Sequence, residues 1–186
     1  MNTKAALLDN AETLARQRGF DGFSFADLEA AVGIRKASVH YHFPTKGDLS
    51  FALMVRYAQL FADRLDAITA SHSTAAARLL AYLDLYRQAL DGGRSLCLCV
   101  ALSATQTALP DTTRDTLDQF HHTVTAWLEA VFRLALTDGT IAAVSDPRAE
   151  AAAALAQVEG AQIMGRAARG PAGFEAAIST LRARAL

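Results

Sequence analysis

Two helix-start signals on either side of a glycine are the feature that most limits how this chain can fold. Ser24 is followed three residues later by Asp27, and Thr45 is followed in the same way by Asp48. In each pair the hydroxyl and the carboxylate can bond the first free amides of a helix, which makes a capping box. Gly33 lies between the pairs and marks a tight turn. The pattern predicts short helices over residues 25–31 and 35–42, and a long helix from residue 46.

Helical spacing continues through most of the chain. Apolar residues recur at every third or fourth position over residues 3–18, 46–68, 74–90 and 113–137. The stretch LCLCVALSA, residues 96–104, is apolar on every side, and a buried helix over 95–107 suits an otherwise helical chain better than a buried strand. We therefore expect an all-α protein. Two short helices joined by a glycine turn predict a helix-turn-helix head over residues 1–48 and a helical body over 49–186.

Composition gives no general reason to expect a nucleic-acid partner. The 186 residues carry a net charge of −1, and residues 1–50 hold six basic and six acidic side chains. No secretory signal and no bilayer-spanning run is visible, so we expect no membrane partner and a cytoplasmic location. On a helix, Cys97 and Cys99 would point to nearly opposite sides, and we expect reduced thiols instead of a structural disulfide.

A local run of basic residues gives the reason to expect a nucleic-acid partner that the overall composition does not give. Residues 33–49 read GIRKASVHYHFPTKGDL and contain no acidic side chain before Asp48. The second helix of a helix-turn-helix enters the major groove, so the residues near its start are expected to reach base edges. These are Arg35, Lys36, Ala37, Ser38 and His40, while Ser38, Tyr41 and Lys46 suit phosphates and Val39 and Phe43 can face inward. The alternative for the basic residues is an ordinary solvated face.

The segment FSFADLEAAVGIRKASVHYHFPTKGDL resembles the DNA-binding region of the TetR family of transcriptional repressors. An aromatic residue, a Ser or Thr, a short helix, an Ala-x-x-Gly turn, the run YHF and a lysine stand in that order, and the resemblance covers about residues 5–50. It implies that Lys36, Ala37 and His40 face bases and that the residues near the DNA backbone are Ser24, Ser38, Tyr41, His42 and Lys46. Arg35 and Ala37 depart from the family pattern, which often has Ser and Gly there.

A single reading helix contacts only a few base pairs, so specificity for a roughly palindromic operator calls for a homodimer. The last two helical segments are the candidate interface, because their alanines permit close helix packing. The residues assigned to it are Leu155, Val158, Gln162, Ile163, Phe174, Ile178 and Leu181. The alternative is that these faces close the core of a single chain.

The resemblance further implies a small-molecule effector bound in the body. Polar and aromatic residues on apolar helix faces are the candidates to line its site: Tyr82, Tyr86, Cys97, Cys99, Ser103, Gln106, Phe120, His121 and Trp127. Each can instead be an ordinary core residue. A second interpretation is a repressor that senses electrophiles or oxidants through its cysteines, with Arg94 near Cys97.

Two other classes of protein can be set against a repressor. An enzyme would need more than Cys97 and His121, since no third orienting residue or glycine-rich phosphate loop is evident. We therefore expect no catalytic residues, no cofactor and no metal, because the spacing of the cysteines and histidines is not that of a zinc site. A helical adaptor for protein partners, without specific DNA binding, would function unchanged after substitution of Lys36 or Tyr41.

Overall fold

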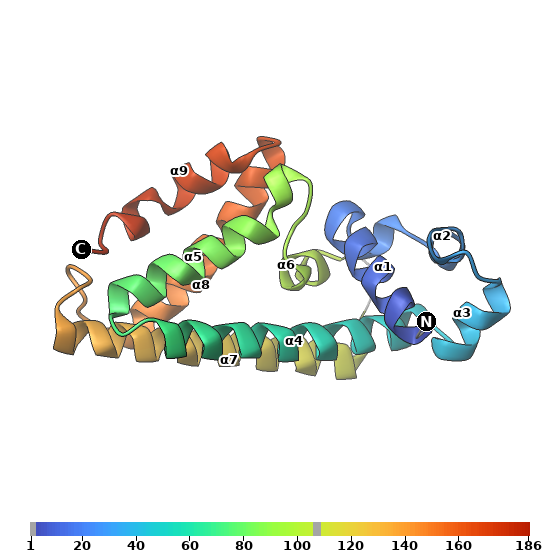
Figure 1. The fold of residues 1–186 in the computed structure, drawn as a ribbon, viewed down its shortest axis with the longest axis horizontal. Coiled ribbons are helices and arrows are strands. Elements are labelled where there is room, and N and C mark those ends of the chain that lie inside the picture. Colours follow the sequence, from blue (N-terminus) through green and yellow to red (C-terminus); the bar gives the residue numbers. More distant parts are fainter. Residues whose placement is uncertain (1–2, 106–108) are drawn as a thin grey trace. The chain divides into compact units, whose positions relative to one another are not determined.

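The structure, a computed structural model, describes residues 3–105 and 109–186. Within these residues all regular elements are helices, and the extended contact between Ile141 and Ala185 is an isolated bridge. The elements are α1 Thr3–Arg18, η1 Phe20–Gly22, α2 Phe25–Val32, α3 Lys36–His42, α4 Lys46–Ser71, α5 Ala75–Ala89, η2 Asp91–Gly93, α6 Leu98–Ser103, α7 Asp111–Asp138, α8 Pro147–Ala167 and α9 Pro171–Arg182 (Figure 1). The predicted all-α fold is confirmed.

The chain forms two compact units, and two of its helices contribute to both. The head unit comprises Met1–Gln59 with Cys97–Asp118, and the body unit comprises Leu60–Leu96 with Gln119–Leu186. Helices α4 and α7 therefore each have one part in either unit. The division differs from the functional boundary predicted at residue 48, which stays a prediction.

In the head unit, the first helices and α6 pack around one apolar core. Helix α1 packs against η1, α2 and α6, and α2 packs against α3. A buried hydroxyl pair, Ser50 and Thr113 with their oxygens 2.9 Å apart, connects α4 to the start of α7. The apolar core consists of residues such as Leu7, Ala11, Phe20, Phe23, Leu28, Val39, Phe43, Leu49 and Leu53. Residues from both segments of the head unit, 1–59 and 97–118, therefore stabilise its fold.

In the body unit, α8 packs along α9, and α5 packs against both. The start of α5 is capped from a distance, since the Ala75 amide donates to Asp138 Oδ2 at 2.7 Å. Burial alone would raise the pKa of Asp138, but the amides of Ala75 and Thr140 outweigh it and lower that pKa. Among the described residues, no helix combines the length and the apolar character that crossing a bilayer requires.

Helix α6 is shorter than the sequence predicts. Cys97 has extended dihedral angles, φ −66° and ψ 152°, so the helix begins at Leu98 and not near residue 95. Because Cys97 lies outside the helix, the two cysteines do not point to opposite sides. Their sulfur atoms lie 2.8 Å apart in the core of the head unit, and no disulfide joins them.

Two adjacent glycines in η2 allow a matched test of packing. Both have a left-handed backbone, φ +63° at Gly92 and +91° at Gly93. A Cβ at Gly92 would meet open space, whereas a Cβ at Gly93 would lie 2.4 Å from the backbone nitrogen of Gly170. We expect Gly92→Ala to lower the free energy of unfolding by about 1 kcal/mol, and Gly93→Ala to lower it by about 2 kcal/mol or more. Denaturant unfolding of both variants measures this, and equal losses would contradict the close contact.

Candidate nucleic-acid interface

The helix-turn-helix begins with the predicted capping box. Asp27 N–H donates to Ser24 Oγ at 3.4 Å, and Ser24 N–H donates to Asp27 Oδ2 at 2.8 Å. The hydrogen bonds from Ser24, side chain before backbone, lower the pKa of Asp27, so the cap is charged at neutral pH. Gly33 then ends α2 in the left-handed conformation, with φ +73°, and its amide donates to Glu29 O. These contacts confirm the cap and the turn that the sequence predicts.

Helix α3, the candidate reading helix, has seven residues and is held mainly by its apolar side. Val39 is fully buried and Phe43, directly after the helix, is 2% exposed, as predicted. Arg35 occupies the N-cap position, and its side chain makes no capping hydrogen bond. The orientation of α3 therefore depends on packing with its neighbours more than on its own caps.

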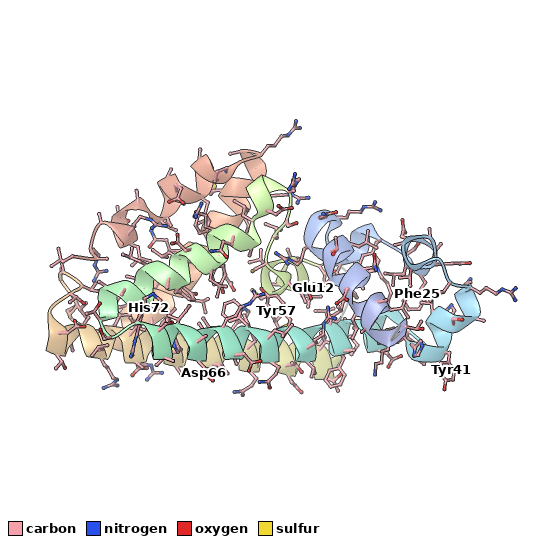
Figure 2. The ribbon with its side chains drawn as sticks, viewed as in Figure 1. Glu12, Phe25, Tyr41, Tyr57, Asp66 and His72 are labelled. Atoms are coloured by element: carbon pink, nitrogen blue, oxygen red, sulfur yellow. The ribbon has the colours of Figure 1, made fainter. Side chains whose placement is uncertain are left out.

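The opposite side of α3 is open. Arg35, Lys36, Ala37, His40 and Tyr41 are exposed, and Tyr41 retains 83% of its surface. Figure 2 shows Tyr41 on the outer side of α3. The part of the chain that the sequence assigns to base edges is thus available to a partner, with two adjacent cations at its start.

The remaining predicted contact residues are partly engaged within the head. His40 Nδ1 lies 3.3 Å from Pro44 O, and its ring meets the edge of Phe25 at 5.0 Å between centroids. Ser38 and His42 are half-buried. The Ser24 hydroxyl donates to Asp27 Oδ2 at 2.6 Å, so it would contact DNA while keeping its capping role.

Lys46 is half-buried and has partners within the head unit, and its predicted contact with the DNA backbone stays a prediction. Its ammonium group donates to the carbonyl oxygens of Phe20 and Phe23. It also lies 4.6 Å and 4.1 Å from the centroids of the same two rings. Burial lowers the pKa of Lys46, against the nearby charges of Asp21 and Asp27. This geometry makes Lys46 a residue that fastens the start of α4 to the loop around η1.

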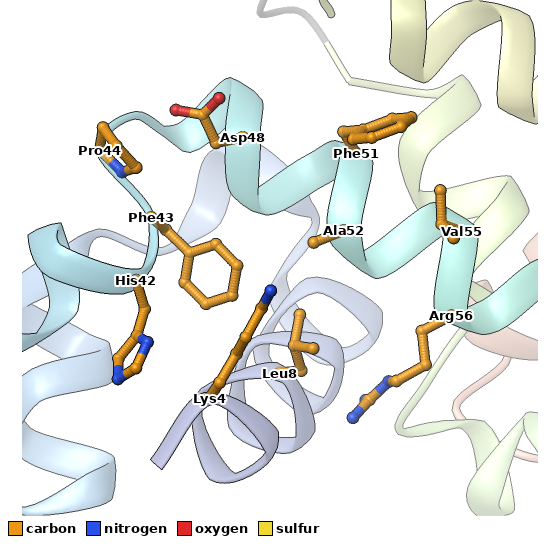
Figure 3. A pocket seen from close by; sticks show the side chains of 10 residues that line it. All are labelled: Lys4, Leu8, His42, Phe43, Pro44, Asp48, Phe51, Ala52, Val55 and Arg56. Carbon is orange, nitrogen blue, oxygen red and sulfur yellow. The ribbon is translucent and has the colours of Figure 1, made fainter. Parts of the chain in front are cut away.

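A groove of about 600 Å³ lies on the head unit beside α3 (Figure 3). It runs along α1 and α4, and of the predicted DNA-binding residues it includes His42. Its lining is Lys4, Leu8, His42, Phe43, Pro44, Asp48, Phe51, Ala52, Val55 and Arg56. The base-facing set of α3 lies outside this lining, so the groove is a separate feature of the head surface.

The predicted effector-binding residues divide between the two units. Tyr82 lies 5.1 Å from Tyr86 and 5.7 Å from Trp127 between ring centroids, and Phe61 joins Tyr86 to Phe120 at 5.6 Å and 5.1 Å. We call these five rings of the body unit the aromatic cluster. Phe61 was not predicted, although its place on the apolar face of α4 could have indicated it.

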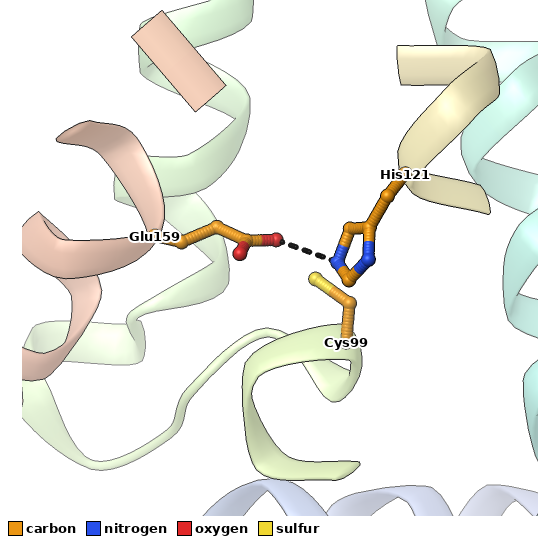
Figure 4. Close-up of side chains that lie close together, drawn as sticks. All are labelled: Cys99, His121 and Glu159. Carbon is orange, nitrogen blue, oxygen red and sulfur yellow. Dashed lines mark hydrogen bonds and ion pairs between the residues drawn. The ribbon is translucent and has the colours of Figure 1, made fainter. Parts of the chain in front are cut away.

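Other members of the predicted effector set lie outside the aromatic cluster. His121 Nε2 lies 3.2 Å from Glu159 Oε1, which pairs α7 with α8 in the body unit (Figure 4). Cys97 and Cys99 belong to the head unit, and Ser103 is exposed. Gln106 lies outside the described residues. Glu159 is an unpredicted partner, since nothing in the sequence relates it to a histidine 38 positions away.

The predicted dimer residues are mostly core residues of one chain. Leu155, Val158, Gln162, Phe174, Ile178 and Leu181 are buried in the body unit. Gln162 donates through Nε2 to the carbonyl of Tyr86. Ile163 is 53% exposed, and so is its neighbour Met164 at 56%. The outward face of α8 therefore differs from the face that apolar periodicity selects.

Taken together, the capped α2, the glycine turn and the exposed basic face of α3 define a helix-turn-helix DNA-binding protein. Comparison with known proteins agrees: residues 7–53 match bacterial regulatory proteins of the tetR family. The chain is 44% identical over 43 residues to IcaR of Staphylococcus aureus, a biofilm-operon negative transcriptional regulator, and this match covers 23% of each chain. It is 30% identical over 124 residues to the transcriptional repressor NemR of Escherichia coli, covering 63% of this chain and 61% of NemR.

Similarity to a solved structure extends over nearly the whole chain. A TetR-family transcriptional regulator from Agrobacterium tumefaciens superposes with a TM-score of 0.91 at 29% identity, covering 98% of this chain and 97% of the other. The chain is thus similar to TetR-family transcriptional regulators in its DNA-binding region and in the fold of nearly its whole length. It spans less than two thirds of the length of the curated relatives in these matches.

The role of Lys46 in the head leads to a prediction about stability. We expect Lys46→Met to lower the free energy of unfolding by about 1 to 2 kcal/mol, because two carbonyls and two rings lose their cation. Lys36→Met is the control, since Lys36 is exposed and should leave stability within about 0.5 kcal/mol. Thermal and denaturant unfolding measure both variants. A Lys46→Met protein as stable as the wild type would return Lys46 to the set of candidate phosphate contacts.

Proposed function

We propose that this TetR-family regulator is a homodimeric, ligand-responsive repressor that binds a roughly palindromic operator and leaves it when a small molecule enters the helical body. The observation that supports this most directly is the exposed basic face of α3 opposite its buried anchors Val39 and Phe43. The similarity to IcaR, a negative transcriptional regulator, and to NemR, a transcriptional repressor, favours repression. We further propose a cytoplasmic location, where a regulator reaches its DNA.

The side chains of α3 divide between base and phosphate contacts. Lys36 or Arg35 can donate to the O6 and N7 acceptors of guanine, and the Ala37 methyl can meet a thymine methyl. Tyr41 and Ser38 carry hydroxyls suited to phosphate oxygens. Lys46 is assigned to holding α4 in place instead, because its ammonium group already contacts the carbonyls of Phe20 and Phe23.

The effector site is assigned to the aromatic cluster of the body unit. Flat rings from α4, α5 and α7 suit a small, mainly apolar molecule, and Trp127 also carries an N–H that donates to Thr69 Oγ1 at 2.8 Å. An effector that prefers a head spacing unsuited to DNA must weaken operator binding by the factor by which the operator weakens effector binding.

The dimer surface is assigned to the outward face of α8 with that of α9. Ile163 and Met164 are large apolar side chains left exposed by the fold of one chain. Small exposed residues continue this face along both helices: Ala152, Ala153, Ala156, Gly160, Ala167, Ala172 and Ala176. Small residues let helices of two chains approach closely, while Ile163 and Met164 supply apolar area.

Operator binding is tested first with the DNA upstream of the protein's own coding region. In a gel-shift titration we expect saturable binding that weakens steeply with salt, because phosphate contacts release counterions. Lys36→Ala should change base preference by about 1 to 3 kcal/mol at one position of each half-site. Tyr41→Ala should weaken binding to all sequences alike, since Tyr41 is assigned to phosphate.

Folding controls make this test decisive. Lys36 and Tyr41 are both exposed, so the circular dichroism and the unfolding of Lys36→Ala and Tyr41→Ala should match those of the wild type. If neither substitution alters DNA binding by the folded protein, α3 is not the reading helix. A folded wild type without specific binding, even in selection from genomic fragments, would favour the protein-interaction adaptor.

The dimer assignment yields a separate prediction. We expect Ile163→Asp to raise the dimer dissociation constant about tenfold or more, because a carboxylate would be buried among apolar side chains. Leu136→Asp on α7 is the matched control, since Leu136 is similarly exposed, at 57% against 53% for Ile163, but lies outside the proposed interface. Sedimentation analysis over a concentration series measures both. Equal dissociation of the two variants would place the interface elsewhere.

A further inference from the structure

The core of the head unit contains a pair of thiols apart from the exposed face of α3. Cys97 and Cys99 are both fully buried, and their sulfur atoms lie 2.8 Å apart. They are the two cysteines of the chain, so any intramolecular disulfide must join them. A short movement would bring the sulfurs to the bond length of a disulfide, about 2.05 Å.

The backbone around the pair makes this approach possible. Cys97 is the N-cap residue of α6 and has an extended conformation, whereas Cys99 lies in the first turn of the helix. The change of conformation between them folds both side chains to the same side. Tyr57 on α4, with 6% of its surface exposed, lies near enough that burial, and then both cysteines, raise the pKa of its phenol. The phenol therefore stays protonated and can donate a hydrogen bond to sulfur.

We propose that Cys97 and Cys99 form a reversible disulfide that weakens operator binding when an oxidant of the hydroperoxide class is present. One thiolate attacks a peroxide oxygen, which gives a sulfenic acid and releases the other oxygen as water after protonation. The second thiolate attacks the sulfenic sulfur, forms the S–S bond and releases a second water. Two thiols and one hydrogen peroxide thus give one disulfide and two waters, and a dithiol reductant reverses the change.

The position of Cys97 and Cys99 in the fold explains how a disulfide between them would affect the head unit. Cys97 is the first residue of the chain to return to the head unit, and α6 packs against α1. Beyond α6, Thr105 Oγ1 donates to Asp21 Oδ2 at 2.7 Å, which ties this segment to η1. Closing a ring across residues 97–99 draws Cys99 out of the first helical turn. The packing of α6 on α1 must then change, and the start of the head moves with it.

The effect on DNA rests on the operator binding proposed above, but formation of the disulfide does not. We therefore design the test with two independent readouts on the full-length protein. Reduced protein is treated with hydrogen peroxide and divided. Intact mass and thiol titration under denaturing conditions report the disulfide, and a gel shift on the upstream DNA reports affinity.

For the wild type we expect loss of two hydrogen atoms, loss of both free thiols, a monomeric band on a non-reducing gel and operator binding weakened about tenfold or more. Dithiothreitol should restore the original mass, both free thiols and the operator affinity. Cys97→Ala/Cys99→Ala should bind the operator with unchanged affinity before and after peroxide. Each single variant should lose the intramolecular disulfide.

Retention of both thiols, oxidation to sulfinic acid or a disulfide between two chains would overturn the disulfide whether or not the protein binds DNA. Formation of the disulfide with unchanged operator affinity would overturn its regulatory role. Absence of operator binding by the reduced wild type would instead refute the proposed function, while the mass measurement would still decide the chemistry. Since the mass measurement uses the wild type, it stands even if a variant fails to fold.

Discussion

The position of α3 depends on contacts that lie outside α3. A helix of seven residues is too short to be stable alone, and this one has no side-chain cap at its start. Val39 and Phe43 hold it from within, while the capping boxes of α2 and α4 fix the elements on either side. An exposed basic face is useful to a DNA-binding protein only when such neighbours set its angle. The head must therefore be stable as a whole before any single residue can read a base.

The same dependence explains the place of Lys46. A lysine at the start of α4 is near the predicted DNA surface in sequence, yet its ammonium group is surrounded by the rings and carbonyls of Phe20 and Phe23. Its positive charge thus joins α4 to the loop that follows α1. This contact stabilises the packing of α4 on that loop, which differs physically from neutralising a phosphate.

Local signals account for what the sequence predicted well. The capping boxes, Gly33 and the inward positions of Val39 and Phe43 each depend on neighbours within a few residues, and these are visible in a sequence. The features that the sequence does not determine are long-range. Apolar periodicity identifies the face of α8 that contains Val158 and Gln162, but it does not show whether the partner is α9 of the same chain or a second chain. Likewise, the extended conformation of Cys97, after which α6 begins, has no signal in the neighbouring sequence.

The membership of the head unit has a consequence for regulation. Residues 97–118 belong to it, and Ser50 on α4 bonds Thr113 on α7 within its core. Both of these helices continue as single helices into the body unit. A helix does not change its register or tilt at one end without affecting the other, because its backbone hydrogen bonds are continuous. Events at the aromatic cluster can therefore reach the head unit through α4 and α7, whereas the proposed disulfide would act on the head through the packing of α6 on α1.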